Sequence, residues 1–444
     1  MSKRYYNDLK EYCNEVAKLV KERITKNDVV IIDEYKYKSS VEKVNLGQFD
    51  LEDRESILEK VDMEPVVPHH KNSSVDKISL EEAFRSQNIL LINMVTSEYS
   101  FELEFFGQGS SQQCDFIFSS TANHYLEWLI NSCESSYDVV SILMIILIKS
   151  ELKAIMKDRK ISILDYYFDK IEMNLWPRFT TAFEHFLNNI KNAKPKNFKL
   201  YNNSIHFTTQ RYVSLVLMLY KIASKTGHNM LLSRLSQMQT LFITFIENLT
   251  NVNLTRPQEQ KSKLFFLINN LHYIYSSISN LHLDIELKDL SKLEEKYSSQ
   301  VTSYITNTLN DQYSNMIAIV DELAPAGDSD SSSGDEETKE QWEHDISPSM
   351  LKNIDKKKIE MIAQEFNMMF RDKIDNVMKT VNVNSYSDKI SKHILSKFMR
   401  TLIFKYSTFL EIVKMAHPSF FKESMSSHHI LLELKNISID VAKD

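Results

Sequence analysis

Leu80-Glu81-Glu82-Ala83-Phe84-Arg85-Ser86-Gln87 opens the stretch of sequence that decides the fold. Ser79 precedes it and Glu82 follows three residues later, which is the capping-box pattern of a helix start. Apolar residues continue through Ile92, and the stretch runs on to Phe105-Phe106 without a proline. We therefore predict a long helix from residue 80, although the order Phe-Arg-Ser-Gln is more specific than a helix requires.

The composition of the whole chain is that of a helical protein. Its 444 residues are 43% hydrophobic, which is enough for a substantial core. Gly 6 and Pro 8 are low counts for this length, and they favour long helices over a turn-rich β protein. The formal charge of −7 argues against general nucleic-acid binding, which leaves a basic footprint. Three cysteines without metal-type spacing, Cys13, Cys114 and Cys133, are typical of reduced thiols.

Changes of composition along the chain predict four segments. They are an N-terminal helix with a mostly irregular linker (1–78), a main helical-bundle region (79–323), an acidic disordered loop (324–346) and a C-terminal helical bundle (347–444). The first helix is expected over residues 2–25. In the linker, Val29-Val30-Ile31-Ile32 allows a short strand, but nearby prolines favour a loop. In the acidic loop, Ser332 and Ser333 precede acidic residues, so the loop is either a solvated tether or a phosphorylation site.

Several further helices follow from apolar periodicity. The run Val139 to Ile148 is shorter than the roughly 20 residues that a membrane span needs, so we expect a fully buried helix. Apolar stripes at helical spacing predict helices over 264–278, 285–323 and 390–413, with one more helix start at Ser347-Pro348. The stripe over 390–413 is expected to end before Pro418, because a proline disfavours helix at the residue before it.

Six short segments, in order, carry a resemblance to a known family. They are Glu64-Pro65-Val66-Val67-Pro68-His69, Phe84-Arg85-Ser86-Gln87, Leu175-Trp176-Pro177-Arg178-Phe179, Thr209-Gln210-Arg211-Tyr212, Phe266-Leu267-Ile268-Asn269-Asn270 and His428-His429-Ile430-Leu431-Leu432-Glu433-Leu434-Lys435. Together they resemble the vacuolar protein sorting-associated protein 52 family, a subunit of the GARP and EARP tethering complexes. The resemblance runs from about residue 64 to residue 435.

The sequence departs from the family pattern at three places. Gln210 stands where family members carry one of two basic residues, and the acidic tract after Pro325 looks like an insertion. Family members also have a long N-terminal coiled-coil portion before the matched region. We expect this chain to lack that portion, which the resemblance assigns to complex assembly.

The chain shows no enzyme motif, and neither a cofactor nor a metal is predicted. Gly107-Gln108-Gly109 lacks the third glycine of a dinucleotide turn and is interpreted as a turn between helices. His428 and His429 are neighbours that point about 100° apart on a helix, which disfavours a shared metal ion. Trp176-Pro177 is expected to be a core aromatic beside a helix break. Arg85 and Arg211 could contact acidic partners, or each could cap a neighbouring helix end or pair with Glu98 or Glu104, and we favour a structural role.

Two groups of lysines offer a further alternative. Lys191, Lys194, Lys196 and Lys199 form one group, and Lys352, Lys356, Lys357 and Lys358 form the other. Either group could approach an anionic membrane surface, where each basic residue contributes about 1 kcal/mol. The second group follows the acidic tract closely, which could neutralise it.

The resemblance implies an all-α, elongated rod of stacked helical bundles that acts by binding alone. It implies a subunit of a GARP/EARP-type vesicle-tethering complex in retrograde endosome-to-trans-Golgi transport and endocytic recycling. The implied partners are other tethering-complex subunits, a Rab-type GTPase and SNARE proteins, at the cytosolic face of trans-Golgi and endosomal membranes. Alternatives are a subunit of the exocyst or of the conserved oligomeric Golgi complex, or an unrelated helical scaffold. The family-motif positions, mostly structural and open to partner binding, are Phe84, Arg85, Ser86, Gln87, Trp176, Pro177, Arg211, Tyr212, Asn269, Asn270, His428, His429 and Glu433.

Overall fold

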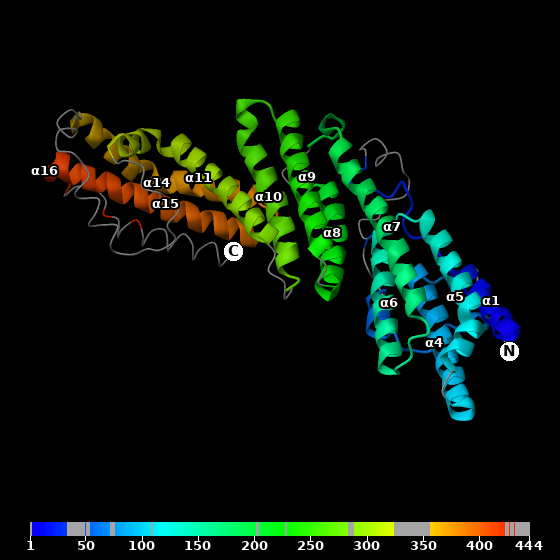
Figure 1. Cartoon of the computed structure of the whole chain (residues 1–444). Coiled ribbons are helices and arrows are strands. Elements are labelled where there is room, and N and C mark those ends of the chain that lie inside the picture. Colours follow the sequence, from blue (N-terminus) through cyan, green and yellow to red (C-terminus); the bar gives the residue numbers. More distant parts are fainter. Residues whose placement is uncertain are drawn as a thin grey trace. The chain divides into compact units, whose positions relative to one another are not determined.

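The computed structural model describes residues 2–32, 49, 54–71, 76–107, 110–200, 204–226, 229–282, 288–323, 356–421, 426 and 430. These residues are mostly helical (Figure 1), and among them extended backbone pairs only in one bridge, between Val20 and Ile78. The predicted all-α class is therefore confirmed. The four expected segments remain a prediction.

The chain divides into two compact units, which we describe separately. The first comprises Met1–Lys199, His206–Val252 and Ile274–Leu290, and the second comprises Leu200–Ile205, Asn253–Tyr273 and Ser291–Asp444. Helices of the first unit are α1 (Ser2–Leu19), α3 (Glu55–Glu59), η2 (Pro68–His70), α4 (Leu80–Phe106), α5 (Ser110–Glu134), α6 (Val139–Asp158), α7 (Asp165–Asn192), η3 (Pro195–Asn197), α8 (Phe207–Thr226) and α9 (Asn229–Asn253). The later helices are η4 (Pro257–Glu259), α10 (Gln260–Ser279), α11 (Lys288–Leu323), α14 (Lys356–Asn384), α15 (Asp388–Ala416) and α16 (Pro418–Phe421).

Helix α6 is the centre of the first unit. It packs against α4 and α7, while α4 and α7 also contact α5. Residues Val139 to Ile148 are buried almost without interruption, as the apolar run predicts. Lys149 continues this buried face, and its Nζ lies 2.5 Å from a carboxylate oxygen of Glu172. The charge is tolerated inside the bundle because it is paired.

Helix α4 starts at the residue that the sequence indicates. The Ser79 hydroxyl accepts a hydrogen bond from the Glu82 amide at 3.4 Å, which caps the helix. The capping box is only half formed, because the Glu82 carboxylate binds Arg85 and Ser86 instead. The helix ends at Gly107, whose φ of 77° lies in the left-handed region that favours glycine.

Helix α1 is shorter than the sequence predicts, and irregular backbone follows it. Helix α1 ends at Leu19 rather than at residue 25, because the backbone at Val20 and Lys21 pairs with Ile78. Residues 29–32 form no strand, as the loop interpretation predicts. The described part of the linker also contains the short helix α3, which contacts α4 and α6.

The later helices confirm the remaining apolar stripes. Helix α10 covers 264–278, and α15 runs to Ala416 before His417-Pro418. Helix α11 begins at Lys288, and its backbone leaves the helical region at Tyr313, an interruption that the stripe does not predict. The expected helix start at Ser347-Pro348 lies outside the described residues.

Candidate functional site

Arg85 binds the irregular linker to the first turns of α4. Its guanidinium donates to both carboxylate oxygens of Glu82, at 3.1 and 2.7 Å. It also donates to three carbonyl oxygens of the linker, those of Val61, Met63 and Glu64, at 3.4, 2.8 and 3.1 Å. Of the structural roles considered for Arg85, the alternative of a pair with Glu98 or Glu104 is wrong, because Glu82 and the linker backbone occupy its donors. Together with Ser86, Arg85 and Glu82 form what we call the linker clamp.

The remaining motif residues of α4 are buried beside the linker clamp. Ser86 donates to Glu82 at 3.1 Å and accepts from the Val66 amide at 3.1 Å, so it holds a further linker residue. Phe84 is part of the hydrophobic core. Gln87 is fully buried, and its amide group has no hydrogen-bond partner among the described residues.

A buried charge cluster lies under the same part of the linker. Arg54, immediately before α3, donates to Glu81 of α4, and its guanidinium lies 3.2 Å from a carboxylate oxygen of Asp138 at the start of α6. Ser141 completes the cluster, because its hydroxyl donates to Glu81 at 2.7 Å and its amide donates to Asp138 at 2.9 Å. The cluster therefore connects α3, α4 and α6 through side chains that are almost wholly buried.

The pKa values of the two carboxyl groups in this cluster are shifted in opposite directions. For Glu81, burial alone would raise the pKa, but the charge and hydrogen bonds of Arg54 and the Ser141 hydroxyl outweigh burial and lower it. For Asp138, burial dominates and raises the pKa despite the attraction of Arg54 and with a further contribution from the charge of Glu81. One cation thus faces two carboxyl groups, and the balance between its attraction and the cost of burial differs between them.

Arg211 and Tyr212 place the first part of the linker on α8. The Arg211 guanidinium is buried, donates to the Val29 carbonyl at 2.8 Å and lies 5.2 Å from the ring centroid of Phe49. The Tyr212 ring stacks on Phe242 with centroids 4.0 Å apart, and burial raises the pKa of its hydroxyl. Both side chains therefore face the interior of the first unit, and the hydrogen bond described for Arg211 goes to linker backbone.

Asn269 and Asn270 have a similar task in the second unit. Asn269 donates to the Asn384 carbonyl at 2.8 Å and accepts from the Tyr386 amide at 3.3 Å, which fixes the turn between α14 and α15. Asn270 donates to the Ser204 carbonyl at 3.4 Å and to the Phe266 carbonyl at 2.8 Å. Both side chains are fully buried.

Trp176 and Pro177 differ from the prediction. Helix α7 continues through Pro177, so the expected helix break is absent. Trp176 is half-buried rather than a core residue, and it meets Phe179 edge-on with centroids 5.7 Å apart. Pro177 is exposed, which lets water reach the carbonyl that a proline ring leaves unbonded. The last motif lies outside this description, since His428, His429 and Glu433 are not among the described residues.

The described residues contain no cluster of histidine, cysteine and acidic side chains suited to hold a metal ion. Cys13, Cys114 and Cys133 are unpaired and buried, and burial raises the pKa of each thiol to about 12. Thiols with such pKa values are poor nucleophiles near neutral pH.

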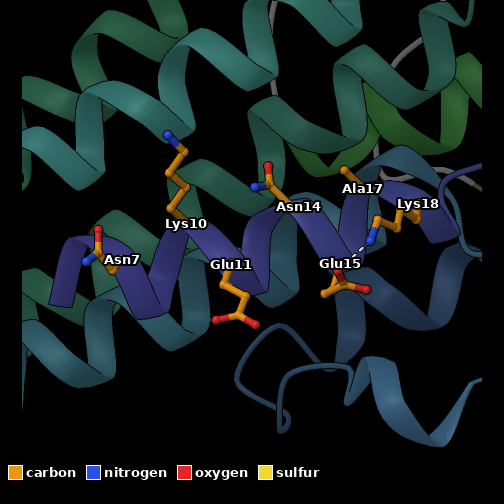
Figure 2. Close-up of a pocket in the computed structure, with 7 residues that line it drawn as sticks. All are labelled: Asn7, Lys10, Glu11, Asn14, Glu15, Ala17 and Lys18. Atoms are coloured by element: carbon orange, nitrogen blue, oxygen red, sulfur yellow. Dashed lines mark hydrogen bonds and ion pairs between the residues drawn. The ribbon is translucent and has the colours of Figure 1, made fainter. Parts of the chain in front are cut away.

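The outer face of α1 carries a shallow hollow, shown in Figure 2. All seven lining residues belong to this one helix: Asn7, Lys10, Glu11, Asn14, Glu15, Ala17 and Lys18. Lys10 and Asn14 point to one side of the helix and Glu11 to the other, while Lys18 pairs with Glu15 at 2.5 Å. The side chains do not converge, so the hollow offers no enclosed site for a small ligand.

The sequence analysis missed Arg54 and Asp138 because they lie far from Glu81 along the chain. An acidic residue among apolar neighbours is the one sequence feature that points to such a cluster, and it identifies Glu81 without its partners. None of the helices in the described part of the chain is both long and apolar enough to span a membrane.

Most of the motif residues described above lie in a region that matches a protein family. The model of the family described as "Vps52, C-terminal" matches residues 1–305, which include both the linker clamp and the asparagine pair. The chain belongs to this family. The resemblance seen in the motifs is thereby confirmed, and the match to the Vps52 family also includes α1.

Curated relatives of the Vps52 family align with more of the chain. It is 25% identical over 421 residues to vacuolar protein sorting-associated protein 52 B of Arabidopsis thaliana, covering 93% of this chain and 56% of the relative. It is 23% identical over 332 residues to the human vacuolar protein sorting-associated protein 52 homolog, covering 72% of this chain and 45% of the relative. The chain thus spans about half the length of these relatives.

Proposed function

We propose that this chain is a non-enzymatic subunit of a GARP/EARP-type vesicle-tethering complex. Its role is retrograde transport from endosomes to the trans-Golgi network and endocytic recycling. The observation that carries the proposal is the Vps52 family match over residues 1–305. Several motif residues, among them Arg85, Arg211 and Asn269, are buried and hold the chain's own backbone, which supports a structural rather than a catalytic role for them.

The proposed partners are the other subunits of the tethering complex, a Rab-type GTPase and SNARE proteins. Contact with membranes is peripheral, at the cytosolic face of the trans-Golgi network and endosomes. Such a subunit works through surfaces on helices, and the described helices leave several apolar side chains exposed. No step of this function requires a reacting side chain.

Affinity purification of the tagged chain from its own cells, followed by mass spectrometry, tests the proposal. We expect enrichment of the other GARP or EARP subunits over a control helical protein with the same tag. Recovery of exocyst or conserved oligomeric Golgi subunits in their place would overturn the proposal. So would recovery of no tethering subunit by a chain whose circular dichroism shows a folded helical protein.

A further inference from the structure

The free end of the α4–α5 hairpin carries three exposed phenylalanine rings. Phe101, Phe105 and Phe106 are 50%, 72% and 64% exposed. The Phe105 ring stacks on Phe101 with centroids 5.7 Å apart and meets Phe106 edge-on at 4.9 Å. We call these three residues the aromatic tip. In the view of Figure 1, this end of the hairpin extends beyond the nearby ends of α6 and α7.

The fold does not need the aromatic tip. At this level α4 and α5 are joined by the Cys114 thiol, which lies 3.1 Å from a carboxylate oxygen of Glu102, and both residues are buried. A Phe ring gains about 1.5–3 kcal/mol when it is fully buried, so three clustered exposed rings forgo a large stabilisation. Exposed apolar clusters on soluble proteins are typical of interaction sites. Leu103 and Phe116, which are 47% and 76% exposed, add apolar area on the same two helices.

Within α4 and α5, the charge beside the aromatic tip is of one sign. Between Arg85 and Lys149 the sequence contains no lysine or arginine. The acidic residues of this stretch are Glu98, Glu102, Glu104, Asp115, Glu127, Glu134 and Asp138. Glu104 stands within the sequence of the aromatic tip and Asp115 follows Cys114 on α5, and both are exposed.

Lysines and arginines on neighbouring elements include Lys3 and Arg4 of α1, whose start lies beside α5 because the Ser2 hydroxyl donates to the Ile117 carbonyl at 3.2 Å. Arg4 adjoins Tyr5, whose hydroxyl donates to Glu98 at 2.7 Å. The Arg4 side chain is 90% exposed and lies 3.9 Å from Asp8. Arg159, after α6, donates to Asn93 and Thr96 of α4, more than one helical turn before Phe101. Lys3 is exposed at the start of α1.

We propose that the aromatic tip with Glu104 and Asp115 is a docking surface for a partner polypeptide whose apolar side chains are flanked by lysine or arginine. Apolar side chains would cover the rings, and the cations would meet the two carboxylates and the ring faces. An anionic membrane is disfavoured because its charge has the same sign as the tip. A second copy of the chain docked tip to tip is disfavoured for the same reason.

The proposal rests on the proposed function only in that the chain acts by binding, and its test uses no tethering subunit. The purified full chain is titrated with a synthetic amphipathic helix of leucine and lysine, followed by fluorescence anisotropy. The same peptide with glutamate in place of lysine tests the charge. We expect the lysine peptide to bind and the glutamate peptide to bind at least about tenfold more weakly.

Variants locate the binding. Phe105→Ser with Phe106→Ser is expected to weaken binding of the lysine peptide about tenfold or more, since aromatic side chains dominate interfaces. Glu104→Lys with Asp115→Lys, which keeps the rings, is expected to weaken it as well. The matched control is Tyr166→Ser with Met173→Ser, which removes two side chains of α7 that are 72% and 75% exposed. Circular dichroism checks that all variants fold.

Three results would overturn the proposal. The first is equal loss of peptide binding in the tip variant and in the α7 control. The second is binding of the wild-type chain to phosphatidylserine-containing vesicles that the tip variant loses. The third is a wild-type dimer in sedimentation that the tip variant abolishes. Peptide binding at the tip would stand even if no tethering subunit copurified, so the two proposals fail separately.

Discussion

Arg85, Arg211 and Asn269 do the same work at three places in the chain. Arg85 and Arg211 donate to carbonyl oxygens of backbone outside the helices, and Asn269 donates to that of Asn384, the last residue of α14, where no helical amide is available. Buried carbonyl groups without partners are costly, so such side chains determine whether an irregular segment can lie against a helix. At the residue scale, these three motif residues therefore lie where helical backbone meets a loop or a helix end.

The charge cluster at Arg54 allows a direct comparison of two acidic residues. We expect Glu81→Gln to lower the free energy of unfolding by about 3–5 kcal/mol, because it takes a carboxylate from a buried guanidinium. Asp138→Asn is expected to cost less, under about 2 kcal/mol, because burial already favours the neutral form of Asp138. Urea unfolding at pH 7 measures both, with Glu15→Gln in the exposed pair with Lys18 as control. Equal costs for the two variants would contradict the assignment.

His272 makes the stability of the second unit depend on pH. Burial, and then the charges of Lys389 and His393, lower the pKa of His272 to about 4 from its usual 6.5. Between these two values the unfolded chain binds a proton that the folded chain does not bind. Stability is therefore complete above pH 6.5 and falls as the pH drops toward 4. His393 contributes in the same direction, because burial also lowers its pKa.

Urea midpoints of the wild-type chain and of His272→Gln at pH 7 and pH 5 test this dependence. The variant is expected to lose less stability than the wild type between the two pH values. His70→Gln, at an exposed ring, should leave the dependence unchanged. An identical fall in wild type and His272→Gln would show that other groups set the acid sensitivity.

At the scale of elements, the sequence predicts helices that show an apolar periodicity. It does not predict contacts with backbone that is distant along the chain. The buried run Val139 to Ile148 and the stripe of α15 are correctly predicted, because an apolar face repeats with the helical period whatever it packs against. The partners of Arg85 could not be predicted, because a free carbonyl of a loop has no signature in its side chain. The early end of α1 has the same cause, since it depends on pairing with Ile78.

Helix α7 offers a prediction about an element as a whole. Proline inside a helix costs about 3 kcal/mol relative to alanine, through a lost hydrogen bond and a steric clash. Because Pro177 is exposed within a continuous helix, we expect Pro177→Ala to raise the free energy of unfolding by about 1–3 kcal/mol. Urea unfolding measures the gain, and Met173→Ala, at another exposed site on α7, should change stability by no more than about 0.5 kcal/mol. A loss of stability would mean that the packing of Trp176 depends on the proline.

At the scale of the whole molecule, the match to the Vps52 family and the compact units do not coincide. The family match runs over residues 1–305 and so ends inside α11, whereas the chain passes from one unit to the other after residues 199, 205, 252, 273 and 290. The region that matches the family thus includes parts of both units. The acidic stretch of the aromatic tip belongs to the first unit alone.

Because each unit has its own core, we expect the two to lose structure separately. Hydrogen exchange with mass spectrometry in moderate urea, at pH 7, tests this with Glu81→Gln. The variant should lower the free energy of exchange protection in α4, α6 and α7 by the whole destabilisation that the lost charge pair causes. Glu81 lies on α4, which packs against α6, and α6 packs against α7. Protection of α14 and α15 should stay at the wild-type level, and Asn269→Ala should give the opposite pattern, because its bonds fix the turn between those helices. Equal loss of protection in both units with either variant would mean that the chain unfolds as one cooperative body.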